Sequence, residues 1–170
     1  MPTRTKSSPV AILMGSDSDL SVMENCIEQL EGFEIKPIVR ILSAHRTPHA
    51  ATEFAANAAA NGVKVIIAAA GMAAHLAGAM AAHSQLPIIG VPIQAKEGPC
   101  GLDALLSTVQ MPPGMPVAAM AIGKAGAKNA AVFAVQILAL ADKALAKKLT
   151  DFRKAQTDAV LKKDAELNAD

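Results

Sequence analysis

A short apolar run followed by a turn and a helical pattern repeats along this chain, and the repetition restricts the possible folds more than any other feature. Val10 to Leu13 precede the turn-prone segment GSDSD, after which apolar residues recur at helical spacing. Short apolar strands that alternate with helices form parallel sheets covered on both faces. We therefore expect an α/β fold, a three-layer αβα sandwich with a flavodoxin-like parallel sheet, and the strand order 2-1-3-4-5 fits five such units. The other expected strands are 35–42, 63–69, 88–91 and 117–122.

Three helices can be placed between or after these strands. Thr47 is expected to be the N-cap of one helix, with Pro48 at its first position. A second, alanine-rich helix is expected at 73–82, and a long third helix at 125–146.

The length of 170 residues fits one domain, which we expect to span residues 1–170 with a core at 9–140. Residues 142–170 hold seven Lys and Arg and six Asp and Glu, together with a narrow apolar stripe. Because the charges are mixed in sign, this tail is expected to form a C-terminal surface helix at 149–167. We assign it no chemistry.

The stretch from Val65 to Ala95 contains no Lys, Arg, Asp or Glu. Its histidines, prolines and glycines argue against a membrane span, so burial within protein explains it better. A domain of this size has too little interior to bury a helix of small residues on every face. We therefore expect part of this surface to contact a second copy of the chain in a homo-oligomer.

Composition and charge exclude several classes of function. The net charge is +1, and the chain has no Trp or Tyr, so neither a basic surface nor stacking platforms for nucleic acid are expected. Cys26 and Cys100 form no CxxC motif and have no His at ligand spacing, which argues against a disulfide scaffold and a structural zinc site. The polar N-terminal segment lacks the apolar region of a signal peptide. A reducing, cytoplasmic setting fits best.

Ligands of open parallel sheets bind at the carboxyl ends of the strands, so the loops after the first three strands are the candidate site. The first loop, Gly15 to Asp19, offers a glycine, two hydroxyls and a helix N-terminus, which can hold a phosphate or a sugar hydroxyl. An ordinary capped turn would look the same, so this loop alone is weak evidence.

The second loop, Ser43 to Pro48, places His45 beside Arg46 at the start of a helix. Arg46 can bind a phosphate with two hydrogen bonds, and His45 can carry a proton near neutral pH. The third loop, Ala70 to Leu76, combines small residues with a second imidazole, His75. A single His on an alanine helix is more often a packing residue, so His75 carries less weight than His45, and His83 less still.

Five segments in this order resemble the PurE family of de novo purine biosynthesis. They read VAILMGSDSDLSVM, ILSAHRTP, GMAAHLAGAMAAHSQLPIIGVPI, GLDALLSTVQMPPGMPVA and AIGKAGAKNAA, and the resemblance covers about residues 9 to 140. SAHR and AAHL look like the mutase branch of that family. The resemblance implies a flavodoxin-like subunit, an octamer, and an isomerase that moves a carboxyl group from the exocyclic nitrogen N5 of an imidazole ribonucleotide to ring carbon C4. It implies no metal, no ATP and no organic cofactor.

Residue roles follow from the same resemblance. His45 matches the family's catalytic histidine, and we assign His75 to the catalytic residues as well. Met72 and Ala77 stand where mutase members usually have Gly and Pro. The resemblance implies that the ribonucleotide is bound by Gly15, Ser16, Asp17, Ser18, Asp19, Ser43, Ala44, Arg46, Ala70, Gly71, Ala74 and Leu76.

Two other functions remain open from the sequence alone. A related carboxylase would consume CO2 directly, and the substrate that supports activity would separate it from a mutase. A flavodoxin-like module that binds a phosphorylated ligand without converting it would release that ligand unchanged.

Overall fold

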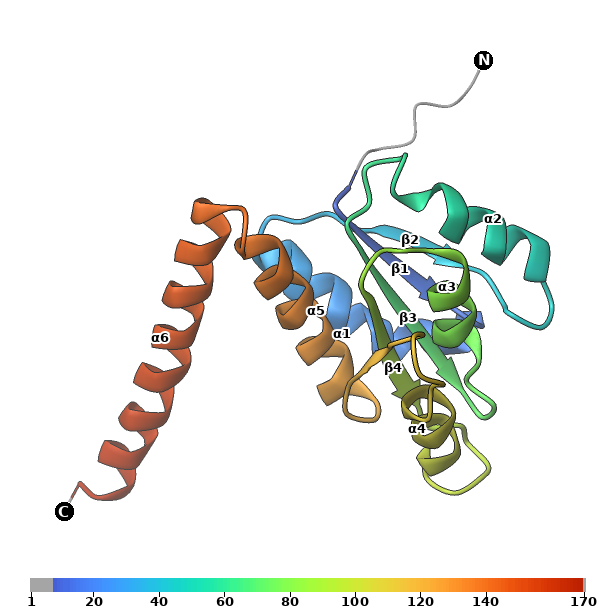
Figure 1. The fold of residues 1–170 in the computed structure, drawn as a ribbon. Helices are drawn as coiled ribbons and strands as arrows, with labels where there is room; N and C mark the ends of the chain where they lie inside the picture. The colour runs from blue at the N-terminus through green and yellow to red at the C-terminus, as the bar shows by residue number, and fades with distance from the viewer. Residues whose placement is uncertain (1–7, 170) are drawn as a thin grey trace. The chain divides into compact units, whose positions relative to one another are not determined.

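The computed structural model describes residues 8–169, and the chain divides into two compact units after Ala134. The first unit contains a five-stranded parallel sheet with the order β2-β1-β3-β4-β5 (Figure 1). The α/β class and the expected strand order are therefore confirmed. The strands are β1 (Val10–Met14), β2 (Ile38–Ile41), β3 (Val65–Gly71), β4 (Ile88–Ile93) and β5 (Ala118–Ala119).

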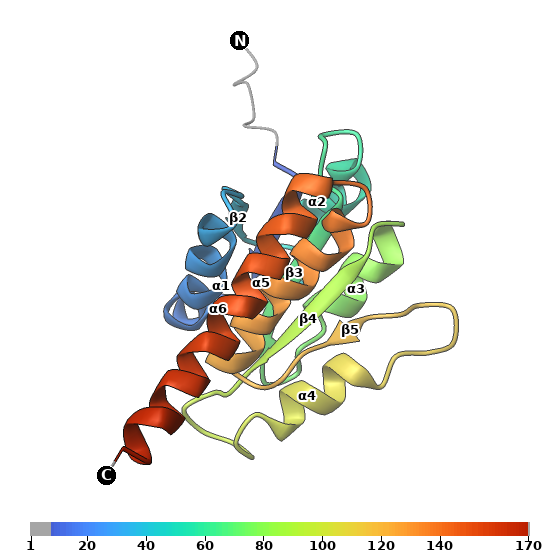
Figure 2. The same cartoon turned by 90° about the vertical axis from the view of Figure 1, so that its left-hand side faces the viewer.

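Helices cover both faces of this sheet (Figure 1). Figure 1 shows α2 and α3 on one face and α1 on the other, and α4 packs on β4 and β5 (Figure 2). The helical segments are η1 (Asp17–Asp19), α1 (Leu20–Gly32), α2 (Pro48–Ala58), α3 (Leu76–His83), α4 (Leu102–Val109) and α5 (Lys124–Ala139), which extends into the second unit.

The core forms because β1 and β3 are apolar on both faces. All five residues of β1 are buried, and alternate residues point to opposite sides of the sheet. Ala11 and Leu13 join one cluster with Ile66 of β3, beneath α2 and α3. This packing fixes the middle of the sheet, and therefore the points at which the three candidate loops leave it. The helix residues of that cluster are Ala51, Ala55, Ala58, Leu76, Ala77 and Met80.

Several expected bounds differ from the structure. β5 has only two residues instead of the six expected at 117–122, and its partner strand carries Pro92, which has no N–H to offer a neighbour. The expected helix at 125–146 ends at Ala139. Asp142 then caps a new helix by accepting hydrogen bonds from the N–H groups of Ala144 and Leu145. Helix α4 was not expected as a separate element.

The second unit ends in α6 (Lys143–Leu167), which starts six residues before the surface helix expected at 149–167. None of its residues is buried, and three Lys-to-acid pairs at i,i+4 spacing lie along it. Each such exposed pair adds only about 0.3–0.5 kcal/mol, so the helix is supported mainly by good helix formers. Among residues 8–169, no helix is long and apolar enough to cross a membrane.

Candidate functional site

Three loops meet at the carboxyl edge of the sheet because β2, β1 and β3 are neighbours. The first loop follows β1, the second follows β2 and the third follows β3. Arg46 in the second loop donates a hydrogen bond of 2.6 Å from Nη2 to the carbonyl oxygen of Gly15 in the first. His45 reaches the third loop, where its Nε2 lies 2.8 Å from Nδ1 of His75. The second loop is therefore bonded to both others.

The two imidazole rings meet edge to face, with centroids 5.0 Å apart and an angle of 83° between their planes. Both residues are exposed, so the pair is accessible from the surface. One nitrogen of each ring is used in the mutual hydrogen bond, and one ring must donate while the other accepts. This contact brings the two predicted catalytic histidines together.

The first loop is a short helical turn closed by its own side chains. Ser16 accepts a hydrogen bond from the N–H of Ser18, and its own N–H donates to Oδ2 of Asp19 at 3.2 Å. Asp17 and Ser18 are exposed, whereas Asp19 is buried. Burial raises the pKa of the Asp19 carboxyl, although hydrogen bonds from Ser16 and Ser18 and the charge of Arg46 act in the opposite direction. Asp19 is therefore a buried carboxyl held within the loop by hydrogen bonds from Ser16 and Ser18.

The second loop is organised around the buried Ser43. Its hydroxyl oxygen accepts hydrogen bonds from the backbone N–H groups of His45 and Arg46, at 3.3 and 3.1 Å. Ser43 therefore holds the backbone of both functional residues, in addition to any contact with a ligand. Ala44, which lies between Ser43 and His45 in the chain, is half-buried.

Thr47 stands at the predicted N-cap position of α2, and its side chain makes no capping hydrogen bond to the helix. Its hydroxyl instead bonds backwards to Ser43, accepting from the backbone N–H and donating to the carbonyl oxygen. Thr47 at the N-cap and Pro48 at the first helical position are therefore both confirmed, while the Thr47 hydroxyl serves the second loop instead of the helix. Sequence reasoning missed this link because a threonine before a helix usually bonds forward.

The predicted residues of the third loop differ in how far their side chains are buried. Ala70 and Gly71 are half-buried at the end of β3, while the side chains of Ala74 and Leu76 are buried. Leu76 can therefore offer a ligand only its backbone N–H, which lies at the first position of α3 where no intrahelical acceptor exists. A Cβ on Gly71 would lie 3.0 Å from the carbonyl oxygen of Ile93, so a larger residue here would crowd the neighbouring strand.

Other reactive groups do not compete with this site. Cys26 is buried, and burial raises the pKa of its thiol to about 12, so it remains protonated and unreactive. Within residues 8–169, no group of three or more His, Cys, Asp or Glu side chains lies close enough to hold a metal ion. The absence of a metal requirement stays a prediction.

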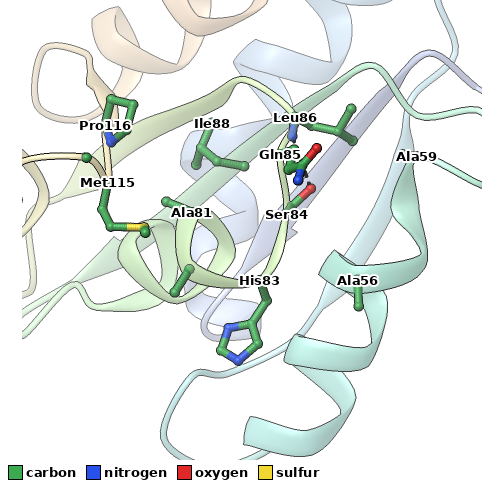
Figure 3. Close-up of a pocket in the computed structure, with 12 residues that line it drawn as sticks. Ala56, Ala59, Ala81, His83, Ser84, Gln85, Leu86, Ile88, Met115 and Pro116 are labelled. Atoms are coloured by element: carbon green, nitrogen blue, oxygen red, sulfur yellow. Dashed lines mark hydrogen bonds between the residues drawn. The ribbon is translucent and has the colours of Figure 1, made fainter.

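An open groove of about 720 Å³ lies at the other end of α3 (Figure 3). It is lined by Ala56 of α2 and by Ala59 just after that helix, by Ala81 and His83 of α3, and by Met115 near β5. Nδ1 of His83 lies 2.9 Å from the carbonyl oxygen of Ala79. His75 precedes the first residue of α3 and His83 is its last, so the structure keeps His83 and this groove away from the three loops.

Comparison with known proteins identifies the family of the chain. A sequence model of the AIR carboxylase family matches residues 9–159. The chain belongs to the AIR carboxylase family. This membership confirms the resemblance to the PurE family drawn from the five segments.

Relatives within the AIR carboxylase family match most of the chain. The N5-carboxyaminoimidazole ribonucleotide mutase of Brucella melitensis is 54% identical over 154 residues, which cover 91% of this chain and 94% of that protein. The protein of the same name from Escherichia coli strain K12 is 51% identical over 161 residues, covering 95% of each. The crystal structure of Treponema denticola PurE has a TM-score of 0.84 at 27% identity and covers 94% of this chain and 98% of that one.

Proposed function

We propose that this chain is an N5-carboxyaminoimidazole ribonucleotide mutase of purine biosynthesis. The observation that carries the assignment is the identity of 51–54% to mutases over more than nine-tenths of the chain. The joined loops support it, because hydrogen bonds link the imidazole pair of the second and third loops and tie Arg46 to the first loop, which carries the buried Asp19. A carboxylated ribonucleotide needs partners of these kinds.

The reaction requires the protein to transfer protons and to confine CO2. The bond between N5 and the carboxyl carbon breaks, CO2 is released within the site, and N5 receives a proton. C4 then bonds to the carbon of CO2 and loses its own proton. We assign both proton transfers to His45, which donates to N5 and later accepts from C4, so its protonation state is restored.

His75 and the small residues of the third loop complete this assignment. His75 shares a hydrogen bond with His45 and therefore stabilises its ring in one orientation. Ala70 and Gly71 would form the wall that holds CO2 close to C4, so that recapture is faster than escape. No step in this scheme requires a metal or an organic cofactor.

Arg46 and the first loop are assigned to the ribonucleotide. Arg46 is exposed and uses Nη2 for the Gly15 carbonyl, which leaves other guanidinium N–H groups for the phosphate. Asp19 would accept a hydrogen bond from a ribose hydroxyl, supported by Ser16 and Ser18. These two assignments give the phosphate and the sugar to the second and first loops, which the hydrogen bond from Arg46 to Gly15 joins.

The substrate that is converted tests this function. Purified protein is incubated either with N5-carboxyaminoimidazole ribonucleotide alone, without ATP or bicarbonate, or with aminoimidazole ribonucleotide and bicarbonate. Formation of 4-carboxyaminoimidazole ribonucleotide from the first substrate is expected. Activity with the second mixture alone would identify a carboxylase, and binding of both ligands without conversion would identify a binding module.

We also propose that the chain assembles as a homo-oligomer, an octamer by its resemblance to the PurE family, in the cytoplasm. Helix α4 exposes Leu102, Leu106 and Val109 at helical spacing, each about half exposed. Such an apolar stripe is costly in water and typical of protein contacts. The uncharged helix α3 also leaves Ala82 and His83 exposed. The cytoplasmic assignment is supported by two free cysteines.

Light scattering tests the assembly. The wild-type protein is expected to have the mass of an octamer at micromolar concentration, and Leu106→Glu is expected to break it into smaller species because a charge would enter a desolvated contact. Lys128→Glu provides a control on an exposed charged position of α5. A monomeric wild-type protein would contradict the proposal.

A further inference from the structure

Thr47 closes the second loop on itself through three hydrogen bonds to one residue. Its backbone N–H donates to the carbonyl oxygen of Ser43 at 3.0 Å, and its hydroxyl donates to the same oxygen at 3.2 Å. The hydroxyl oxygen also accepts from the backbone N–H of Ser43 at 2.8 Å. Both backbone polar groups of Ser43 are therefore bonded to Thr47.

The next bonds in the path reach the functional residues. With its backbone held by Thr47, Ser43 directs its hydroxyl oxygen to the N–H groups of His45 and Arg46. Those two residues then extend in different directions, His45 to the ring of His75 and Arg46 to the carbonyl of Gly15. One hydroxyl group thus acts on both contacts that join the three loops.

We propose that Thr47 is the positioning residue of the active site, and that its hydroxyl sets the places of His45 and Arg46 through Ser43. This inference rests on the proposed function only for its kinetic readout. The residue does not touch the substrate in this scheme. It acts by fixing the backbone of residues that do.

A role limited to starting α2 does not account for these contacts. Thr47 makes no side-chain capping bond to α2, and Pro48 supplies a backbone already shaped for the first turn. Loss of the hydroxyl would therefore leave the start of the helix in place. It would release Ser43, whose burial makes an unpaired N–H costly.

Thr52 provides a matched control on the same helix. Its hydroxyl donates to the carbonyl oxygens of Pro48 and His49, but it does not accept a hydrogen bond from the backbone of a candidate loop. Thr47→Val and Thr52→Val both exchange a hydroxyl for a methyl group of similar size. Thr47→Ser retains the hydroxyl and tests for rescue.

The experiment measures kcat and KM of the three variants for N5-carboxyaminoimidazole ribonucleotide, together with their melting temperatures. We expect Thr47→Val to lower kcat by about 10²-fold and to raise KM, because displacing a reacting group by about 1 Å has a cost of this size. Thr52→Val and Thr47→Ser are expected to stay within about twofold of wild type, as changes without effect on such contacts do.

A spectroscopic readout separates positioning from a general loss of stability. The ¹⁵N chemical shifts of the His45 and His75 ring nitrogens are recorded at the same pH for every variant. The temperature is kept below the melting temperature of each. They are expected to change in Thr47→Val and to remain at wild-type values in Thr52→Val. This measurement needs no turnover, so it tests the inference even if the enzyme has a different activity.

Wild-type kcat together with unchanged ring shifts in Thr47→Val would overturn the inference. If Thr47→Val does not fold, Ser43→Ala replaces it, since that change removes the hydrogen bonds from the N–H groups of His45 and Arg46 to the Ser43 hydroxyl. Altered ring shifts in Ser43→Ala, measured without substrate, would then support the inference, and unchanged ring shifts would overturn it. An inactive wild-type protein would contradict the proposed function instead. The comparison of ring chemical shifts would still test the inference about Thr47.

Discussion

The ring nitrogens Nε2 of His45 and Nδ1 of His75 lie 2.8 Å apart, although thirty positions separate the residues in the sequence. His45 follows β2 and His75 follows β3, and β1 lies between those two strands. Strands two places apart in a sheet are separated by about 9–10 Å, so the two loops must bend over the end of β1 for the rings to touch. The contact therefore depends on the conformation of both loops.

We predict that His45→Asn folds and binds the ribonucleotide but loses turnover. The side chain is exposed, so replacing it has little effect on the core, while the amide of Asn cannot carry the proton. The expected loss in kcat is about 10²–10⁴-fold. Steady-state kinetics and a binding titration check the two parts separately.

His83→Asn is the control for this change, because His83 is also exposed and lies at the far end of α3. It is expected to turn over at the wild-type rate. Normal turnover of His45→Asn would show that another group moves the proton.

We predict that Arg46→Ala weakens binding of the ribonucleotide much more than binding of the same riboside without its phosphate. A hydrogen bond to a charged group contributes about 1.5–3 kcal/mol, so an affinity loss of about 10–10²-fold is expected for the phosphorylated ligand. Calorimetric titration with both ligands measures the difference. Equal losses for the two would place the phosphate elsewhere.

Arg40→Ala is the matched control, since Arg40 lies on β2 with its guanidinium 6.0 Å from the ring of Phe54. Removing it deletes a nearby positive charge without changing the second loop. Its ligand affinity is expected to stay close to that of the wild type.

We predict that Asp19→Asn stabilises the protein at neutral pH and weakens ribonucleotide binding. Burial raises the pKa of the Asp19 carboxyl in the folded protein above its ordinary value of 3.8. The folded state therefore retains this proton over a pH range in which the unfolded chain has released it, and the wild type loses stability as the pH rises through that range. A higher melting temperature than that of the wild type is therefore expected for Asp19→Asn at pH 7.

The pH dependence of this difference provides the check. Well below pH 3.8 the carboxyl is neutral in both states, so the advantage of Asp19→Asn is expected to disappear there. Thermal melts of both proteins across the acid range measure it. An advantage that grows as the pH falls would show that the sign is wrong.

We predict that Met72→Gly stabilises the protein. Met72 has φ of 56°, a left-handed conformation that costs about 1–2 kcal/mol for residues with a Cβ, and its side chain is 64% exposed, so little packing is lost. The added freedom of glycine in the unfolded chain offsets about 0.4–1 kcal/mol of this gain. A net stabilisation of roughly 0.5 kcal/mol is expected in denaturant titrations.

Ala73→Gly is the opposite case at the next position, where φ is not positive. There the glycine relieves no strain and only adds freedom to the unfolded chain, so a small destabilisation is expected. If both variants shift stability in the same direction, strain at Met72 is not the cause.

The sequence predicts the sheet and the three loops because both follow from local patterns. Apolar runs such as 10–13 and 63–69 specify buried strands, and the position of a loop after a parallel strand places it at the ligand edge. The break between Ala139 and Lys143 was missed because alanine and leucine continue the helical pattern across it. There the capping side chain of Asp142, a single residue, determines the boundary.

The contacts within the site depend on side-chain direction, which a pattern does not specify. His75 received little weight in the sequence, because an imidazole beside an alanine helix has no visible partner until the two loops meet. The hydroxyl of Thr47 turns towards Ser43 instead of towards α2, and the amino-acid sequence is compatible with either direction. These choices are made by tertiary packing.

Transfer of an isotopic label tests the central claim most directly. The protein is given N5-carboxyaminoimidazole ribonucleotide with ¹³C in the carboxyl group, in a buffer that contains an excess of unlabelled bicarbonate, and the C4 carboxyl of the product is read by NMR. If the site confines CO2 between its release from N5 and its capture by C4, most product molecules are expected to carry the label. Product labelled only in proportion to the bulk bicarbonate pool would contradict the account, because the carboxyl group would then have come from solution.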